Sequence, residues 1–163
     1  MFPSVISAPV AVWQVPGERL DALKLPPMYV NNEDPKGTAF TVSTDAKKGT
    51  TTGISAADRA LTFRALANPA STADDFLRPG HVFPLRPKEG GVLERDGHTE
   101  AGIDFCRLAG LQPAGVLAEV VNEDGSMARI PELLPFCEEH RLVLTSIADL
   151  AAYIKETEAA KAC

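Results

Sequence analysis

The sequence predicts an α/β fold with at least some parallel strand pairing. Short runs of β-branched and apolar residues, typical of strands, alternate along the chain with segments that carry helical spacing and helix-start residues. Alternation of this kind places helices against a sheet in which some neighbouring strands run parallel. The chain has 163 residues, enough for one domain with a sizeable core, and 45% of them are apolar, as in ordinary globular proteins.

The first third of the chain predicts two strands separated by a helix and a polar loop. We expect a short buried strand over residues 10–15, a short helix over 18–24 and a second strand over 38–44, which is rich in β-branched and aromatic residues. Pro26 and Pro27 end the helix, because proline cannot continue one.

The middle of the chain predicts a capped helix followed by short extended pieces. Ser55 is expected to cap this helix, and Asp58 stands three residues later, at the spacing of a capping box. Residues 74–77 are expected to form one more helical turn. Two short extended pieces are then expected over 81–85 and 91–93.

The last third predicts three helices that alternate with two strands. The strands are expected over residues 115–121 and 142–147, and the helices over 99–108, 131–140 and 148–160. A glycine after the first of these helices and a proline in the first turn of the second are the usual stop and start signals.

Composition and charge exclude several classes of partner. A net charge of -6 argues against a nucleic-acid partner, because proteins that bind a nucleic-acid backbone carry basic patches. No run approaches the roughly 20 apolar residues that a membrane span needs, so no membrane partner is expected. The three cysteines have neither metal-ligand nor redox spacing, which predicts a cytoplasmic location. The glycine-rich fingerprints of dinucleotide and nucleotide binding do not occur in the sequence.

The sharpest local group of candidate site residues lies at residues 95–99. Thr99 is the predicted N-cap of the helix that follows, and the free N–H groups of a helix start attract anions. Arg95 could add a forked donor to a phosphate, and Gly97 lets the backbone approach it closely. The plainer interpretation is a capped helix with a surface arginine.

Two histidines and one acid are further candidates. His98 is either a metal ligand through a neutral ring nitrogen or a plain hydrogen-bonding residue, and the same two interpretations apply to His81. Glu119 lies inside an otherwise apolar run. Its carboxylate either faces solvent on a strand or is buried, an environment that suits a general acid or base.

With these residues the sequence resembles a known family, the 3,4-dihydroxy-2-butanone 4-phosphate synthases. The resemblance is carried by blocks that keep the family's order and spacing from about residue 25 to residue 153. These blocks are GTAFTV at 37–42, TGISAADR at 52–59, RPGHVFPL at 78–85, GGVL at 90–93, GHTEA at 97–101, AGL at 109–111, PAGV at 113–116, DGSMAR at 124–129 and IADL at 147–150.

The resemblance implies a lyase of riboflavin biosynthesis. Members of this family convert ribulose 5-phosphate into dihydroxybutanone phosphate and formate, using magnesium. By resemblance, residues 95–99 would bind the phosphate of this small sugar-phosphate substrate, with Arg95, Gly97 and Thr99 contacting it, and His98 would be a metal ligand. The positions of His81 and Glu119 correspond to catalytic ones. The implied fold is a three-layer α/β sandwich, and the implied assembly is a homodimer with sites near its interface.

The chain departs from the family pattern near its N-terminus. Family members carry an acidic segment, RENEGD, that supplies a metal-binding glutamate, a catalytic aspartate and part of the sugar site, and this sequence contains no such segment. We therefore expect a single domain over residues 1–163, truncated at its N-terminus relative to the family and missing the first strand of its sheet. Two alternatives stay open. One is the same fold repurposed for different, metal-independent chemistry, and the other is a non-catalytic subunit whose partner supplies the missing acids.

Overall fold

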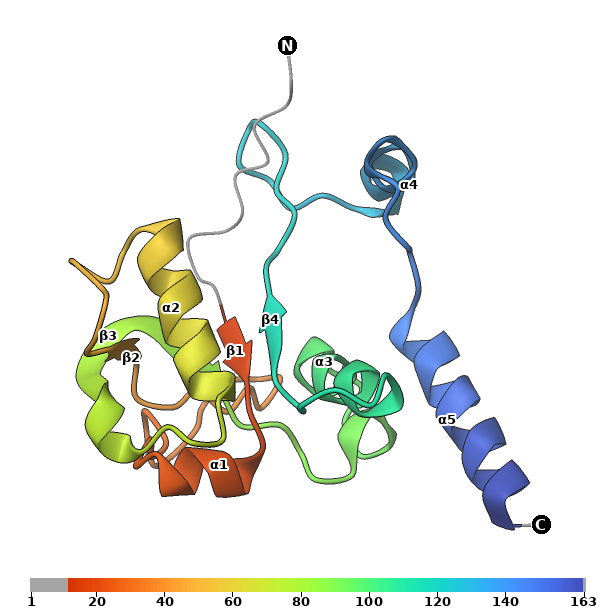
Figure 1. Cartoon of the computed structure of the whole chain (residues 1–163). Coiled ribbons are helices and arrows are strands. Elements are labelled where there is room, and N and C mark those ends of the chain that lie inside the picture. Colours follow the sequence, from red (N-terminus) through yellow and green to blue (C-terminus); the bar gives the residue numbers. More distant parts are fainter. Residues whose placement is uncertain (1–11, 163) are drawn as a thin grey trace. The chain divides into compact units, whose positions relative to one another are not determined.

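A computed structural model of the chain describes residues 12–162, which fall into two compact units (Figure 1). One unit contains the residues up to Leu117, and the other contains the residues from Ala118 onward. That the whole chain forms one domain stays a prediction.

The first unit is built on a four-stranded mixed sheet with the order β2-β3-β1-β4. Its central pair, β1 (Val12–Gln14) and β3 (Phe76–Leu85), runs parallel, as the sequence predicted. β4 (Gly115–Leu117) pairs antiparallel with β1 on one edge, and β2 (Thr44–Ala46) pairs antiparallel with β3 on the other.

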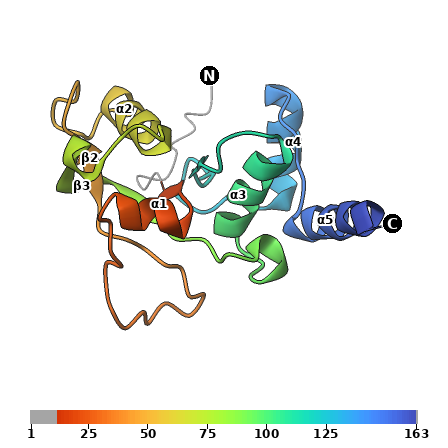
Figure 2. The same cartoon turned by 60° about the horizontal axis from the view of Figure 1, so that its bottom comes forward.

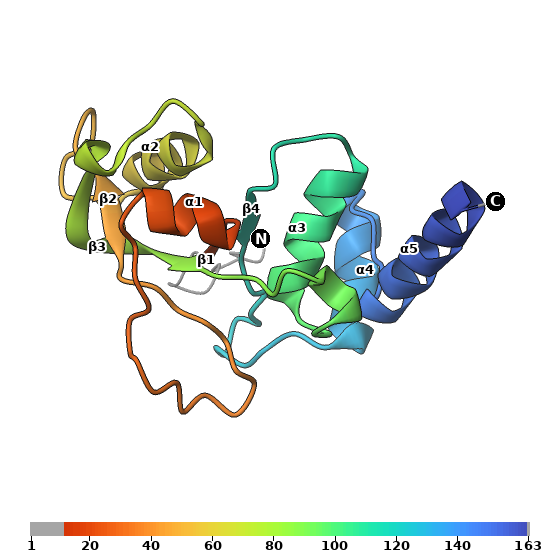
Figure 3. The same ribbon diagram turned by 90° about the horizontal axis from the view of Figure 1, so that it is seen from below.

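Helices cover both faces of this sheet. Helix α1 (Gly17–Ala22) and helix α2 (Ala56–Ala67) lie on the same side of β1 and β3 (Figure 3). They enclose the core with strand residues, and that core consists of Val15, Leu20, Leu23, Leu25, Leu66, Phe76 and Val82. Gln14, the strand residue before Val15, does not belong to this core. Its side-chain Nε2 donates to the carbonyl of His98, the first residue of helix α3 (His98–Leu108). Because neighbouring strand residues point to opposite faces, α3 covers the other face, which confirms the three-layer α/β sandwich.

The strand expected over residues 38–44 is wrong except at its last residue. Residues 23–43 form a long loop that extends away from the helices (Figure 2), and Phe40 and Thr41 make only isolated bridges, to Leu85 and Pro27. The physical reason is a proline in β3, the strand with which this segment would have to pair. Pro84 of β3 accepts a bond from the Thr41 N–H but has no N–H to return, so a continuous ladder cannot form there.

Three further boundaries of the first unit differ from expectation. Residues 91–93 form a short 3-10 helix, η2 (Gly91–Leu93), rather than an extended piece, because Gly91 takes a φ of 60° and turns the chain. The turn expected at 74–77 is the 3-10 helix η1 (Ala73–Asp75), after which β3 begins five residues earlier than the predicted residue 81. β4 ends at Leu117 rather than at residue 121.

The second unit contains two helices, α4 (Ile130–His140) and α5 (Ile147–Ala162), close to their predicted bounds. A single bridge joins Val121 to Met127 across a turn at Gly125, whose φ is 85°. The strand expected over 142–147 is wrong, because this exposed segment finds no strand to pair with among residues 118–162. No helix of the described residues combines the length and the apolar character needed to cross a membrane.

Candidate functional site

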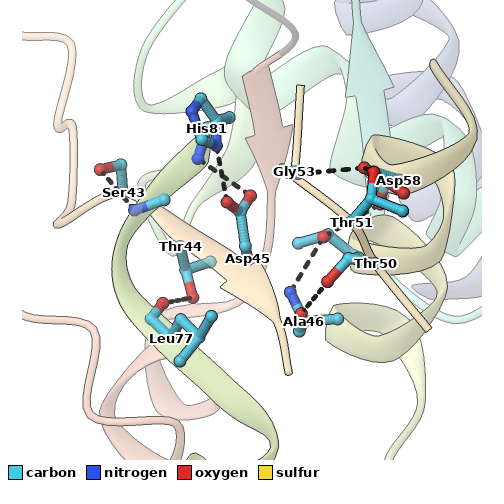
Figure 4. A network of polar contacts seen from close by, with 12 residues as sticks. Ser43, Thr44, Asp45, Ala46, Thr50, Thr51, Gly53, Asp58, Leu77 and His81 are labelled. Carbon is cyan, nitrogen blue, oxygen red and sulfur yellow. Dashed lines mark hydrogen bonds and ion pairs between the residues drawn. The ribbon is translucent and has the colours of Figure 1, made fainter. Parts of the chain in front are cut away.

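The His81 site lies at a break in register between β2 and β3. Thr44 lies opposite Val82, whereas the next residue, Asp45, lies opposite Leu77. The residues between Leu77 and Val82 therefore bulge out of the ladder, and bulges of this kind re-aim side chains. In this bulge His81 comes to face Asp45 across the sheet edge (Figure 4).

Asp45 contacts His81 at two atoms. The backbone N–H of His81 donates to Asp45 Oδ1 at 2.9 Å, and the ring nitrogen Nδ1 lies 2.7 Å from Asp45 Oδ2. The two side chains differ in exposure, which is 8% for Asp45 and 45% for His81. The carboxylate is thus an internal group that holds one edge of a ring whose other edge is available to a ligand.

A threonine-rich loop closes over this pair. Gly53 has a φ of 84°, and its backbone lies so close that a Cβ would overlap Asp45 Oδ2 and His81 Nδ1. The N–H of Gly53 and the hydroxyl of Thr51 both donate to Asp58 Oδ2, at 3.0 and 2.8 Å. The Thr51 hydroxyl, followed by backbone donors, lowers the pKa of the Asp58 carboxyl below its ordinary value.

Asp58 in turn belongs to the start of α2. Ser55 is the N-cap of this helix, and its hydroxyl oxygen accepts from the Asp58 N–H at 3.0 Å, which confirms the predicted cap. The loop over the His81 site is therefore anchored on a helix start.

Arg95 and Gly97 form a second group, at the start of α3. Arg95 Nη1 pairs with Glu100 Oε2 at 2.5 Å, Nε donates to the carbonyl of Lys36 at 3.0 Å and Nη2 to the hydroxyl of Thr38 at 3.4 Å. Gly97 is required here, since a Cβ would overlap both Arg95 and Glu100. These contacts use three of the five N–H groups of a guanidinium.

Thr99 does not cap α3. The N-cap is Gly97, and Thr99 is the second residue of the helix and is buried. The reason is that Arg95 and Glu100 pack closely around Gly97. This packing places the start of the helix at His98, one residue before the predicted start. His98 is exposed, and its carbonyl is held by Gln14 Nε2 at 3.0 Å.

Glu119 lies in the second unit, two residues after the end of β4, and its side chain is exposed. The buried alternative for this carboxylate is therefore wrong. Its position on a strand is also wrong, because the strand has already ended. A part for Glu119 in the site stays a prediction.

The described residues do not by themselves fit a protein-held metal site. No three of their His, Cys, Asp and Glu side chains gather closely enough to hold an ion. His98 offers a single imidazole at an exposed helix start, whereas magnesium prefers oxygen ligands in octahedral geometry.

Sequence reasoning missed two acids of these groups. Asp45 lies in a run of Thr, Ser and Ala in which apolar and polar residues do not alternate as they do in a strand. Glu100 directly follows His98 and Thr99, which were themselves the predicted site residues. The signal that could have identified both acids was a carboxylate inside a segment that is expected to be buried. Counted as whole residues, backbone included, Asp45 and Glu100 are 6% and 1% exposed, and buried carboxylates need partners.

Comparison with known proteins identifies similar sequences over most of the chain. The model of the 3,4-dihydroxy-2-butanone 4-phosphate synthase family matches residues 8–153. Riboflavin biosynthesis protein RibBA of Salinispora tropica is 62% identical over 138 residues, 85% of this chain and 34% of that protein. 3,4-Dihydroxy-2-butanone 4-phosphate synthase of Agrobacterium fabrum is 57% identical over 141 residues, 86% of this chain and 66% of that protein. The chain thus spans about a third of the length of its RibBA relatives.

Solved structures agree with this similarity. A crystal structure of 3,4-dihydroxy-2-butanone 4-phosphate synthase in complex with two magnesium ions has a TM-score of 0.89 and 44% identity, and the match covers 93% of this chain and 76% of that one. A structure of the synthase of Candida albicans has a TM-score of 0.84 and 46% identity, covering 91% of this chain and 73% of that one.

Proposed function

Because this chain belongs to the 3,4-dihydroxy-2-butanone 4-phosphate synthase family, we propose that it catalyses the family's lyase reaction in riboflavin biosynthesis. In this reaction ribulose 5-phosphate gives dihydroxybutanone phosphate and formate. Identities of 57–62% to relatives named for this pathway or this enzyme favour the family reaction over repurposed chemistry.

The observation that carries the proposal is the environment of His81. Removal of a proton next to a carbonyl group needs a positioned base. A half-exposed imidazole held on one edge by a buried carboxylate suits that task, because one ring nitrogen is oriented by the protein and the other can meet the substrate. We assign proton transfer to His81, with Glu119 as the second proposed acid or base.

The group at the start of α3 is the proposed phosphate site. Arg95 keeps two N–H groups beyond its contacts with Glu100, Lys36 and Thr38, and a guanidinium binds a phosphate through paired N–H groups. Gly97 and Thr99 lie at the helix start, where free N–H groups favour an anion. The ion pair with Glu100 would hold the guanidinium in place for this contact.

Magnesium is part of the proposed reaction mixture because a related structure holds two magnesium ions. In the present chain His98 is the one residue proposed to contact the metal. The proposal further includes a cytoplasmic location and a homodimer, and sedimentation velocity of the purified chain tests the latter.

The test of the proposed function is formate release. The purified chain is incubated with ribulose 5-phosphate and magnesium, and formate and dihydroxybutanone phosphate are followed by NMR. We expect one formate for each product molecule, and a loss of about 100-fold or more in His81→Ala, the range for removal of a general base. His140→Ala, which changes an exposed histidine of α4, is the matched control and should keep full activity. No formate at high enzyme concentration would overturn the proposal.

A further inference from the structure

We infer that Asp45 is a positioning residue that fixes the neutral imidazole of His81 in the tautomer with the proton on Nδ1. The lone pair then resides on Nε2, at the ring edge away from Asp45. The meaning of this arrangement for catalysis rests on the proposed function, but the tautomer itself does not. The inference follows from the hydrogen-bonding capacities of the atoms that meet at the bulge of β3.

The two oxygens of Asp45 face two different partners. Oδ1 meets the backbone N–H of His81 at 2.9 Å, and a backbone N–H can only donate. Oδ2 meets Nδ1 at 2.7 Å. An ionised carboxylate is an acceptor at both oxygens, so Nδ1 must be the donor and must carry the ring proton.

The surroundings prevent the pair from relaxing into another arrangement. Asp45 is buried, and the backbone of Gly53 fills the space beside Oδ2 and Nδ1. On the opposite strand, a Cβ on Gly80 would overlap the backbone of Thr44, so the bulge is packed tightly against β2. A flipped ring would lose the contact between Nδ1 and Oδ2, whereas a carboxylate turned by half a rotation presents an equivalent oxygen to each partner.

The tautomer decides what His81 can do to a substrate. A neutral imidazole has one donor nitrogen and one acceptor nitrogen. With the proton on Nδ1, Nε2 can accept a proton from a bound sugar phosphate, and the charge that then develops on the ring faces the Asp45 carboxylate. With the opposite tautomer, Nε2 would be a donor and could not act as a base.

The discriminating variant is Asp45→Asn, which keeps the shape of the side chain and removes one acceptor. The amide oxygen must remain with the backbone N–H of His81, since that group can only donate, and the amide NH₂ then faces Nδ1. We expect the ring proton to move to Nε2. Long-range ¹H–¹⁵N correlation spectra of the neutral rings in the full chain, without substrate, report which nitrogen carries the proton.

Asp58→Asn is the matched control for this experiment. Thr51 and Gly53 donate to the same oxygen, Asp58 Oδ2, so one amide oxygen can serve both donors. We expect the His81 tautomer to stay as it is in the unmodified chain. The same spectra of His81→Ala assign the resonances of this ring among the three histidines.

The outcomes separate this inference from the proposed function. An Nδ1–H tautomer in the unmodified chain that becomes Nε2–H in Asp45→Asn supports it, whether or not formate is released. An Nε2–H tautomer in the unmodified chain, or an unchanged tautomer in Asp45→Asn, would overturn it even if the lyase assay succeeds. If the assay does succeed, Asp45→Asn should lower kcat by about 100-fold or more with little change in KM, because the loss falls on proton transfer.

Discussion

At the scale of single residues, the chemistry of this chain depends on close approaches that only glycine permits. Gly53 lies against Asp45 and His81, and Gly97 lies against Arg95 and Glu100. In both cases a side chain would overlap the two paired side chains. The two glycines therefore make room for these pairs, although neither contributes a functional group of its own.

Gly53→Ala should destabilise the chain more than a comparable substitution nearby. Gly49 has almost the same φ, 82° against 84°, but a Cβ there would meet only the end of Leu61 at an ordinary 3.4 Å. We expect Gly49→Ala to cost about 1 kcal/mol of unfolding free energy for the backbone strain alone. Gly53→Ala should cost about 3 kcal/mol, because Asp45 and His81 must also move. Urea denaturation measures both values, and equal losses would refute the close contact.

At the scale of elements, the site depends on where strands and helices are interrupted. β2 and β3 slip in register between Thr44 and Asp45, and the slip produces the bulge that carries His81. The start of α2 anchors the loop above it through Ser55 and Asp58.

The Asp58 anchor predicts a dependence of stability on pH. Hydrogen bonds, first from the Thr51 hydroxyl, lower the pKa of the folded-state Asp58 carboxyl below 3.8. The stability from this group is therefore fully present above the unfolded value of 3.8, and it is lost as the pH falls through the lower folded value. As the pH falls from 3.8 to that lower folded value, we expect the unfolding free energy to fall less steeply in Asp58→Asn than in the unmodified chain. Denaturation titrations at a series of acidic pH values measure this difference, and identical slopes would contradict it.

At the scale of the whole molecule, the described residues supply a proposed base and a proposed phosphate site but no assembled set of metal ligands. The bulge of β3 carries His81 and the start of α3 carries the residues of the proposed phosphate site, while the sheet and the helices on both its faces hold them. Glu119 lies on an exposed segment of the second unit. The family membership of the chain thus rests on its sequence and fold rather than on a complete metal site.

This arrangement predicts how the chain responds to magnesium. A ligand that binds only the folded state raises the melting temperature, by an amount that grows with the logarithm of its concentration relative to its Kd. Because no three donor side chains gather among the described residues, we expect millimolar magnesium chloride alone to leave Tm unchanged relative to sodium chloride of equal ionic strength. Differential scanning calorimetry makes the comparison. A saturable rise in Tm with magnesium alone would show that the chain does assemble a metal site.

The sequence by itself determined the fold class, the family, and most helices, since periodic spacing and capping residues are local signals. Ser55 and the glycine after α3 marked helix ends that the structure confirms. The sequence failed at the strand of residues 38–44, where Pro84 on the partner decides the pairing, and at Thr99, where the Arg95–Glu100 pair sets the helix start. Only the tertiary structure decided that Asp45 faces His81. That contact joins residues 36 positions apart through a slip in register, and a slip in register leaves no periodic trace in the sequence.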